Sequence, residues 1–513
     1  MAVPSIFNDV IGPIMIGPSS SHVAGAARIG QMTRCLLSRN VSKVIVKFSA
    51  DGALASTYHS QCSDMGFVCG LMGMELNDPE TAKGLDKIKS FMPVEFKIVN
   101  ESSPHPNDYF VEIYEGETKT ELRAISTGGG MIEVYCLDGF SVQLKGDCDV
   151  TAVFADSDIL ASLEAIGAQD IHSQEIQGKY LFLINTKDDL TGPIETNPHV
   201  IRVVRFPSVL PTLSAKHYNL PFTDYSSLLK LLENDHDSYP LSKYAIEYEC
   251  ARGHSDCAST MAYADRILSV MKESIHAGLE QAYYQDRILQ SQAYLMKEKA
   301  EQNALMPVPM LNTVTMYITA VMEAKSSMKP IVAAPTAGAS GCLPGTLFGC
   351  AEHIGATYES IRKALFSAGL IGVFFAGQAT FAAEVAGCQV ECGAASGMVA
   401  AALTELMGGN ARQSLCAASI ALQGITGLAC DPVASRVESP CLNKNIMAGA
   451  NAITSTNMAL SGFEQVIPLD QTIDAILEIG QSLPQSLRCT YGGLGKTPAS
   501  QAIQKKLESK SKS

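Results

Sequence analysis

Three cysteines in the second half of the chain stand in contexts that suit metal binding. Cys388, Cys430 and Cys441 each lie where an expected helix meets glycine or proline, so their thiolates could project from loops into a shared cavity. Three thiolates can hold a [4Fe–4S] cluster and leave one iron open as a Lewis acid. The spacing contains neither a Cys-x-x-Cys pair nor the compact ferredoxin run. From spacing alone, three buried core cysteines are the simpler interpretation, and the other twelve of the fifteen cysteines are expected to pack in cores.

The elements that would position such a site differ along the chain. Up to residue 138, short alternating segments such as Val41–Phe48 and Tyr109–Tyr114 predict strands among helices, an α+β domain. Gly128–Gly130 predicts a tight turn feeding a further strand. From 139 to 210, the expected order is strand, helix, strand, strand, helix and strand, beginning with Phe140–Leu144, which predicts a ferredoxin-like module.

Beyond a proline-rich linker, residues 216–513 carry few strand signals. Stretches rich in alanine, leucine and glycine, such as Gly397–Leu406 and Ser414–Leu428, predict closely packed helices. The fold class is therefore multidomain, with an all-α domain of roughly 290 residues at the end. The uncharged run Ala364–Ala383 is long enough to span a membrane but contains several glycines, and we interpret it as a buried core helix.

Composition narrows the function classes. The chain has 513 residues, 46% hydrophobic, and a net charge of −14, so it has no general attraction to nucleic acid or to anionic membranes. The first ten residues have no signal-peptide pattern, which predicts a cytoplasmic protein whose cysteines are reduced. Neither a Schiff-base lysine nor a phosphate-binding loop stands out, so pyridoxal phosphate is not expected.

Several long motifs resemble one enzyme family. Three early segments are Ile11–Gly30 (IGPIMIGPSSSHVAGAARIG), His105–Asn107 and Ser126–Val134 (STGGGMIEV). They resemble the β portion of bacterial iron–sulfur L-serine dehydratases. Later segments resemble the α portion: Ile331–Gly345 (IVAAPTAGASGCLPG), Gly387–Met407, Gly427–Val433 (GLACDPV), Pro440–Asn445 (PCLNKN) and Leu487–Pro498 (LRCTYGGLGKTP). The resemblance runs nearly end to end, in the order of a β domain (1–138), an ACT-like regulatory module (139–210) and an α domain (216–513).

The resemblance also implies roles for residues. The family's cluster cysteines correspond to Cys388, Cys430 and Cys441, and its active-site serine–histidine segment corresponds to Ser19, Ser20, Ser21 and His22. The loop that holds the amino-acid substrate corresponds to Thr336, Ala337 and Gly338, with Ser340 close behind. Without the resemblance, the serine run would be interpreted as a helix N-cap and the second segment as a turn between helices.

The implied reaction is elimination of water from L-serine to give pyruvate and ammonia. An open iron would polarise the C–O bond, and His22 or another base would take the α-proton. The resemblance implies a small amino-acid substrate and a homodimer.

The sequence departs from the family pattern at positions close to the expected chemistry. Gln61 stands where the family has a histidine, and glutamine cannot act as a base, so His59, two residues earlier, is a candidate replacement. Lys325 replaces an asparagine and would act as a base or carboxylate anchor if buried, or reach solvent if not. Val23 replaces a threonine, and Glu384 is shifted by one position. Two alternatives therefore stay open: the same chemistry on cysteine, threonine or a modified amino acid, and a non-catalytic amino-acid sensor.

Overall fold

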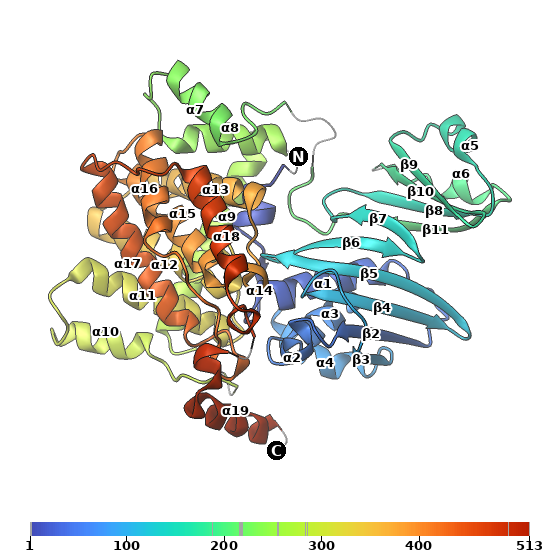
Figure 1. The fold of residues 1–513 in the computed structure, drawn as a ribbon, viewed down its shortest axis with the longest axis horizontal. Helices are drawn as coiled ribbons and strands as arrows, with labels where there is room; N and C mark the ends of the chain where they lie inside the picture. Colours follow the sequence, from blue (N-terminus) through green and yellow to red (C-terminus); the bar gives the residue numbers. More distant parts are fainter. Residues whose placement is uncertain are drawn as a thin grey trace.

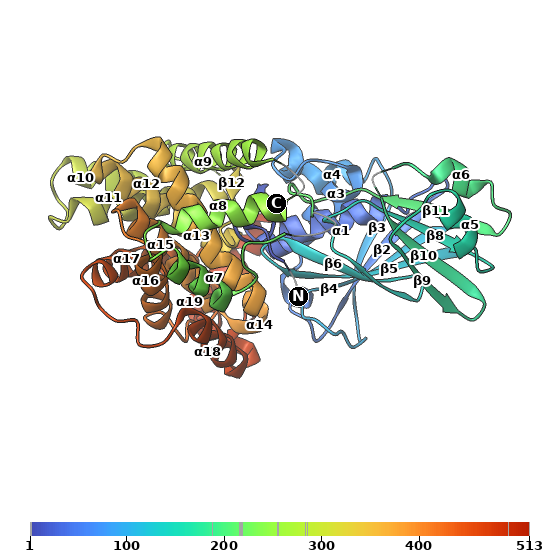
Figure 2. The same cartoon turned by 90° about the horizontal axis from the view of Figure 1, so that it is seen from above.

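The structure is a computed structural model that describes residues 3–186, 188–214, 219–253, 256–282, 284, 286–490 and 492–511. A helical part and a six-stranded sheet lie side by side, and a smaller four-stranded sheet lies at the end farthest from the helices (Figures 1 and 2). The expected domain boundary at residue 216 lies outside the described residues.

The six-stranded sheet has the order β3-β2-β4-β5-β6-β7 and is antiparallel except between β2 and β3. Its strands are β2 (Lys43–Ser49), β3 (Val94–Val99), β4 (Asp108–Glu115), β5 (Thr118–Gly128), β6 (Met131–Leu137) and β7 (Phe140–Leu144). Four helices accompany it: α1 (Gly25–Arg34), α2 (Leu54–Thr57), α3 (Ser63–Met72) and α4 (Gly84–Ile88). Helices α1 and α3 approach so closely that a Cβ on Gly70 would lie 1.8 Å from the Ala27 carbonyl oxygen, so only glycine fits there.

The four-stranded sheet has the order β11-β8-β10-β9, with every neighbouring pair antiparallel. Its elements follow the sequence β8 (Val150–Ala155), α5 (Leu160–Ala165), β9 (Ile171–Ile176), β10 (Lys179–Asn185), α6 (Thr191–Glu195) and β11 (Val200–Phe206). This is the β-α-β-β-α-β order predicted from the sequence, but with β8 as its first strand.

Phe140–Leu144 forms a strand as predicted, yet it belongs to the larger sheet. It pairs with β6 through Leu137 and Phe140, across the two-residue turn Asp138-Gly139. Both turn residues have positive φ, 47° and 87°, as a tight hairpin turn requires. The expected boundary at residue 139 therefore falls inside this hairpin, because alternation of apolar residues defines a strand without defining its partner.

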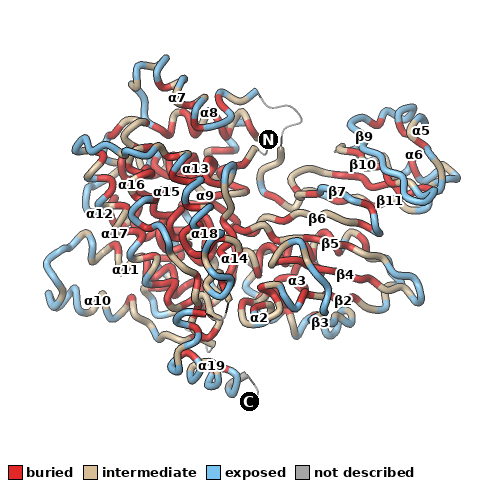
Figure 3. The backbone as a smooth tube through the Cα atoms, in the orientation of Figure 1, coloured by how far each residue is buried: buried red, intermediate tan, exposed pale blue. Residues whose placement is uncertain are grey.

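The C-terminal part is helical. Its helices are α7 (Tyr225–Asn234), α8 (Leu241–Arg252), α9 (Cys257–Leu279), α10 (Ala293–Glu301), α11 (Pro309–Ser326), α12 (Cys342–Ile354), α13 (Tyr358–Gln378), α14 (Ala383–Ala386), α15 (Cys392–Leu406), α16 (Ala411–Gln423), α17 (Cys441–Leu460), α18 (Leu469–Ser482) and α19 (Pro498–Ser511). The largest apolar core lies among α12, α13, α15 and α16, whereas α10 and α19 are largely exposed (Figure 3). Helix α13 is long and apolar enough to cross a membrane, but 72% of its apolar window is buried, as expected of a core helix.

The first residues of the chain pack against this helical part. β1 (Ile14–Met15) pairs with β12 (Ile331–Val332), and the Ser5 hydroxyl donates to Glu249 on α8 at 2.5 Å. Ile6 and Val10 sit against Gly369 and Gly372 of α13, where any side chain would clash. Residues expected to belong to the first domain therefore contribute to the core of the last one.

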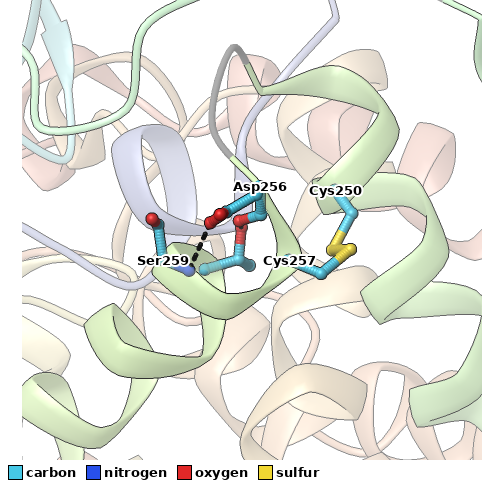
Figure 4. Close-up of a disulfide and its surroundings, with 5 residues drawn as sticks. Cys250, Asp256, Cys257 and Ser259 are labelled. Carbon is cyan, nitrogen blue, oxygen red and sulfur yellow. Dashed lines mark hydrogen bonds between the residues drawn. A yellow bond between two sulfur atoms is a disulfide. The ribbon is translucent and has the colours of Figure 1, made fainter.

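A disulfide joins Cys250 at the end of α8 to Cys257 at the start of α9 (Figure 4). Beside it, Asp256 caps α9 by accepting a hydrogen bond from the Ser259 N–H at 2.8 Å. The expectation that the cysteines are reduced is therefore not met by this pair. Spacing alone does not predict it, because pairing requires the two elements that carry the cysteines to bring their sulfurs together.

Candidate active site

The three cysteines singled out by their sequence contexts meet in the helical part. Cys388 follows α14, Cys441 begins α17, and Cys430 lies on the connection between α16 and α17. One ligand atom from each of Cys388, Glu391 and Cys430 lies within 4.8 Å of the others. Burial, with the nearby Cys388 adding to it, raises the pKa of Cys441 to about 12. These thiols are therefore buried and close together, and burial favours the protonated form of Cys441 unless a cation binds.

A fourth cysteine, Cys489, joins this group. It shares a buried cluster with Cys388 and Cys430, and its N–H donates to the Cys430 carbonyl at 3.0 Å. The Cys430 N–H in turn donates to the Leu487 carbonyl at 2.8 Å, so the two cysteine segments are tied together. Its sequence context predicts only a core cysteine, although Cys489 lies within the Leu487–Pro498 motif.

Two lysines flank the thiols, of which Lys325 is buried and Lys444 is partly buried. Lys444 donates to the Ala429 carbonyl at 2.6 Å and to Asp431 at 2.9 Å, and its Nζ lies 3.8 Å from the Cys388 sulfur. Lys325 is fully buried and donates to the Val437 carbonyl. Burial lowers the pKa of Lys325, while Cys441 opposes that shift. Lys325 therefore does not reach solvent, and the amino groups of Lys325 and Lys444 are placed to balance negative charge on the thiols.

The predicted substrate loop lies against this group. Thr336 caps a short turn over Ala337–Ala339, and its hydroxyl donates to Glu391 at 2.6 Å. A Cβ on Gly338 would lie 3.0 Å from a Glu391 carboxylate oxygen, which shows how closely the loop approaches this side chain. Burial raises the pKa of Glu391 to about 7. Asn445 holds the loop from below by donating to the Gly338 carbonyl at 2.8 Å.

The serine–histidine segment reaches the same place from the first domain. The Ala337 N–H donates to the Ser20 hydroxyl at 3.2 Å, and the Ser21 hydroxyl donates to Glu384 at 3.4 Å. Glu384 lies on α14, four residues before Cys388. The site is thus a junction between the N-terminal domain and the helical part.

His22 is fully buried at this junction, and burial lowers its pKa to about 3. Its Nε2 lies 2.8 Å from the Thr57 hydroxyl, which itself donates to the Ala53 carbonyl. The Thr57 oxygen is therefore the acceptor, and the proton of the neutral ring sits on Nε2. Nδ1 is left as an acceptor, 3.0 Å from the Ser19 hydroxyl and 3.8 Å from Glu384.

His59 and Gln61 lie in different environments, although only one residue stands between them. His59 has 73% of its side chain exposed and pairs with Asp64 at 2.6 Å, an interaction that raises its pKa. Gln61 is 1% exposed, and its amide donates toward the Cys489 sulfur at 3.8 Å. The segment forms turns rather than a strand, since Gln61 N–H donates to Thr57 and Cys62 N–H to His59, so the two side chains do not share a direction. The structure brings Gln61, and not His59, to the thiols.

Ser340 and Val23, which the sequence also singled out, are buried near this junction. Ser340 is fully buried, with its hydroxyl 3.8 Å from the Met322 sulfur, and Val23 packs under Gly17. Sequence reasoning did not assign roles to Glu391, Lys444 or Thr57. Glu391 and Lys444 lie inside the motifs around Cys388 and Cys441, so adjacency to a cysteine was the available signal. Nothing in the sequence marks Thr57.

The residues at the junction fit an iron–sulfur group. Thiolates are the preferred ligands of iron–sulfur clusters, and the charges of the two neighbouring lysines oppose the effect of burial, which otherwise keeps Cys441 protonated. Glu384 Oε2 and Gln61 Oε1 are buried without a hydrogen-bond partner, which leaves acceptors for a bound group or substrate.

Comparison with known proteins identifies relatives of both parts. A family model described as "Serine dehydratase alpha chain" matches residues 236–494. The probable L-serine dehydratase alpha chain of Bacillus subtilis is 39% identical over 47% of this chain and 81% of its own length. The beta chain of the same organism is 32% identical over 40% of this chain and 99% of its own length.

A relative of nearly full length is also found. L-serine dehydratase 2 of Escherichia coli is 26% identical over 95% of this chain and 97% of its own length. The family model falls on the helical part that holds the thiols, and a probable alpha chain and a probable beta chain of Bacillus subtilis both match this single chain. The chain therefore belongs to the serine dehydratase family.

Proposed function

We propose that this protein deaminates L-serine to pyruvate and ammonia by eliminating water. The observation that carries the proposal is the junction itself, where buried thiols and Glu391 of the helical part face His22 and the serine loop of the first domain. Relatives matching each part are named as L-serine dehydratases or their chains.

The proposal includes a [4Fe–4S] cluster held by Cys388, Cys430 and Cys441. When bound, such a cluster supplies an open iron that acts as a Lewis acid on the β-hydroxyl of the substrate. Lys325 and Lys444 stabilise the thiolates, since a cation beside a buried thiolate offsets the cost of burying its charge. Cys489, whose N–H donates to the Cys430 carbonyl, and Gln61, whose amide lies 3.8 Å from the Cys489 sulfur, lie beside the same thiols.

The Thr336–Gly338 loop and Ser19–Ser21 would orient the amino acid. The loop is held rigidly by Asn445 and by the Ala337–Ser20 hydrogen bond, so its backbone amides and hydroxyls are fixed before substrate arrives. Glu391, whose pKa is raised to about 7, can bind the substrate amino group as a carboxylate or hold a proton beside it.

His22 is the residue that we propose takes the α-proton. At neutral pH the ring is neutral, and its Nδ1 lone pair is free to accept a proton once the Ser19 hydroxyl turns away. The imidazolium that results would be stabilised by Glu384, 3.8 Å from Nδ1. Loss of the β-hydroxyl then gives an enamine, which tautomerises and hydrolyses to pyruvate and ammonia.

Two further properties belong to the same proposal. The four-stranded module would bind a regulatory amino acid, since it has the ferredoxin-like strand order and stands apart from the catalytic junction. The protein would act as a homodimer in the cytoplasm. His59, exposed and paired with Asp64, would not act as the base.

The decisive experiment measures pyruvate release from L-serine by protein purified without oxygen and reconstituted with iron and sulfide. We expect turnover that is lost in air, with an absorption band of an iron–sulfur cluster. Cys430→Ser should lose both, and the matched control Cys416→Ser, on α16 and outside the thiol group, should keep both. A stable cluster with sulfide released from cysteine but no pyruvate from serine would assign another substrate. Tight serine binding by iron-free protein without turnover would identify a sensor.

A further inference from the structure

A second site candidate lies away from the thiols, in a cavity of about 570 Å³. It is lined by α1 and β1 of the N-terminal region, by the segment that follows β11, and by α9 of the helical part. None of its lining residues belongs to the junction described above. A cavity of this size suits a small-molecule ligand.

The cavity is lined mainly by positive side chains, whereas the protein as a whole is negatively charged. Arg28, Arg34 and Arg266 line it, against the single carboxylate of Glu75, in a chain whose net charge is −14. Among the described residues, no carboxylate lies within 4.0 Å of these three guanidinium groups, whereas Arg362 and Arg436 pair with Asp265 and Asp286. Arginines gathered without counter-ions are the usual recognition elements for phosphate and carboxylate groups.

Arg28 is a buried arginine with an unpaired hydrogen-bond donor. Its side chain is 1% exposed, and one terminal nitrogen donates to the Gly130 carbonyl at 2.6 Å. Its Nε is buried with no hydrogen-bond partner, although a buried unpaired donor on a charged group is costly. The buried Asp9 carboxylate, which acts on Arg28 from a distance, accepts a hydrogen bond from the Ser5 N–H. Burial lowers the pKa of Arg28 to about 10, so the group is still cationic at neutral pH.

The position of Arg28 connects the cavity to the proposed catalytic junction. Helix α1 begins directly after the short turn Ser20–Ala24, which contains His22. The Gly130 carbonyl that Arg28 holds belongs to the Gly128–Gly130 turn, and a Cβ on Gly128 would lie 2.7 Å from the Ala382 nitrogen, two residues before Glu384. A ligand that bonds Arg28 would therefore act on both elements that position His22 and Glu384.

We propose that this cavity is a binding site for a small organic polyanion, one that carries a phosphate group or at least two carboxylates. Arg28 Nε would donate to one anionic oxygen at the base of the cavity, and Arg34 and Arg266 would bind the others near its mouth. Occupancy would hold α1 and the Gly128–Gly130 turn in place, which makes the site a regulatory one. The binding itself does not depend on the reaction proposed above.

The test is titration calorimetry on the full-length protein with inorganic phosphate, glycerol phosphate and citrate, and with acetate as a monoanion control. We expect saturable binding of at least one polyanion, with a Kd of about 0.1 mM or tighter, and none of acetate. Arg34 and Arg266 are both exposed, so R34Q and R266Q should fold normally and each weaken binding about 10-fold or more. R39Q is the matched control, because Arg39 is exposed on the same segment but does not line the cavity, and it should bind as the unmodified protein does.

Each arm can overturn part of the proposal. If the protein binds the phosphates but not citrate, the ligand carries a phosphate group. If it binds citrate but not the phosphates, the ligand is a polycarboxylate. No saturable binding, or equal weakening by R39Q and R266Q, would refute the site. Hydrogen exchange of the segments 25–34 and 128–131 should slow when the ligand is bound. Binding without that protection would refute the link to the catalytic junction, whether or not the protein turns over serine.

Discussion

The two sides of the proposed active site differ in how they handle charge. On the side of the first domain, His22 is neutral and is satisfied by the hydroxyls of Ser19 and Thr57. On the helical side, the thiols, Glu391 and two lysines are ionisable groups whose charges act on one another. A neutral side suits the acceptance of a proton, and a side with balanced charges suits the binding of a cationic cluster and a zwitterionic substrate.

The same contrast explains why the site needs both domains. The proposed base lies on one side and the thiols on the other, and the serine loop joins them through Ala337 and Glu384. Variants on the two sides should therefore fail differently, one by loss of the cofactor and the other by loss of proton transfer.

The largest effect is expected on the helical side. Cys388→Ser should remove most of the bound iron and lower kcat/KM by about 1,000-fold or more, because the Lewis-acid contribution of a metal is worth several kcal/mol. Cys489→Ser should keep most of the iron and lose about 10-fold in activity, since Cys489 contacts the ligand Cys430 without being one of the three expected ligands. Iron analysis and the cluster absorption distinguish them. Equal iron loss in both would make Cys489 a ligand.

For His22→Gln, we expect a smaller loss of activity that is not accompanied by loss of iron. Glutamine keeps hydrogen bonds to Thr57 and Ser19 but cannot take a proton, so kcat should fall by about 100-fold or more with iron content unchanged. Steady-state kinetics and iron analysis check this. His353→Gln, at an exposed position on α12, is the control that should change neither. Normal kcat in His22→Gln would place the base elsewhere, with Glu391 next to be tested.

Lys325→Met distinguishes the effect of Lys325 on folding stability from its effect on iron retention. Removing a buried cation should leave the unfolding free energy of the iron-free protein unchanged or raise it, because methionine avoids the cost of burying a charge. Iron should nevertheless be lost about 10-fold more readily to a chelator, since Lys325 no longer balances Cys441. Urea unfolding and timed chelation measure the two effects. Chelation at the original rate would mean that Lys325 does not support the cluster.

The last prediction concerns the pH dependence of the unfolding free energy rather than activity or iron binding. Burial lowers the pKa of His22 from 6.5 to about 3, so the unfolded chain binds a proton below pH 6.5 that the folded protein does not. Stability should therefore fall as the pH falls from 6.5 toward 3, and His22 alone should account for a loss of about 2 kcal/mol at pH 5. Urea unfolding at pH 5 and pH 7.5 tests this, with His22→Gln as the comparison. Between pH 7.5 and pH 5, His22→Gln should lose less unfolding free energy than the unmodified protein. An identical loss in the two proteins would contradict a neutral buried His22.

Much of the architecture could be predicted from local sequence patterns. The β-α-β-β-α-β order of the small sheet, the helical character of the last part and the buried α13 all follow from the periodicity of apolar residues, which depends only on neighbours along the chain. Cys388, Cys430 and Cys441 were recognised from their motifs, and the structure places them together.

Contacts between distant segments were decided only by the tertiary structure. The partner of β7, the packing of Ile6 and Val10 against α13, and the approach of Cys489 to Cys430 depend on how elements far apart in the chain meet. The same holds for Gln61, which faces the thiols while His59 faces solvent, because turns rather than a strand connect them. Local patterns set the periodicity and the residue types, whereas burial, pKa and partners depend on the surfaces that close around each side chain.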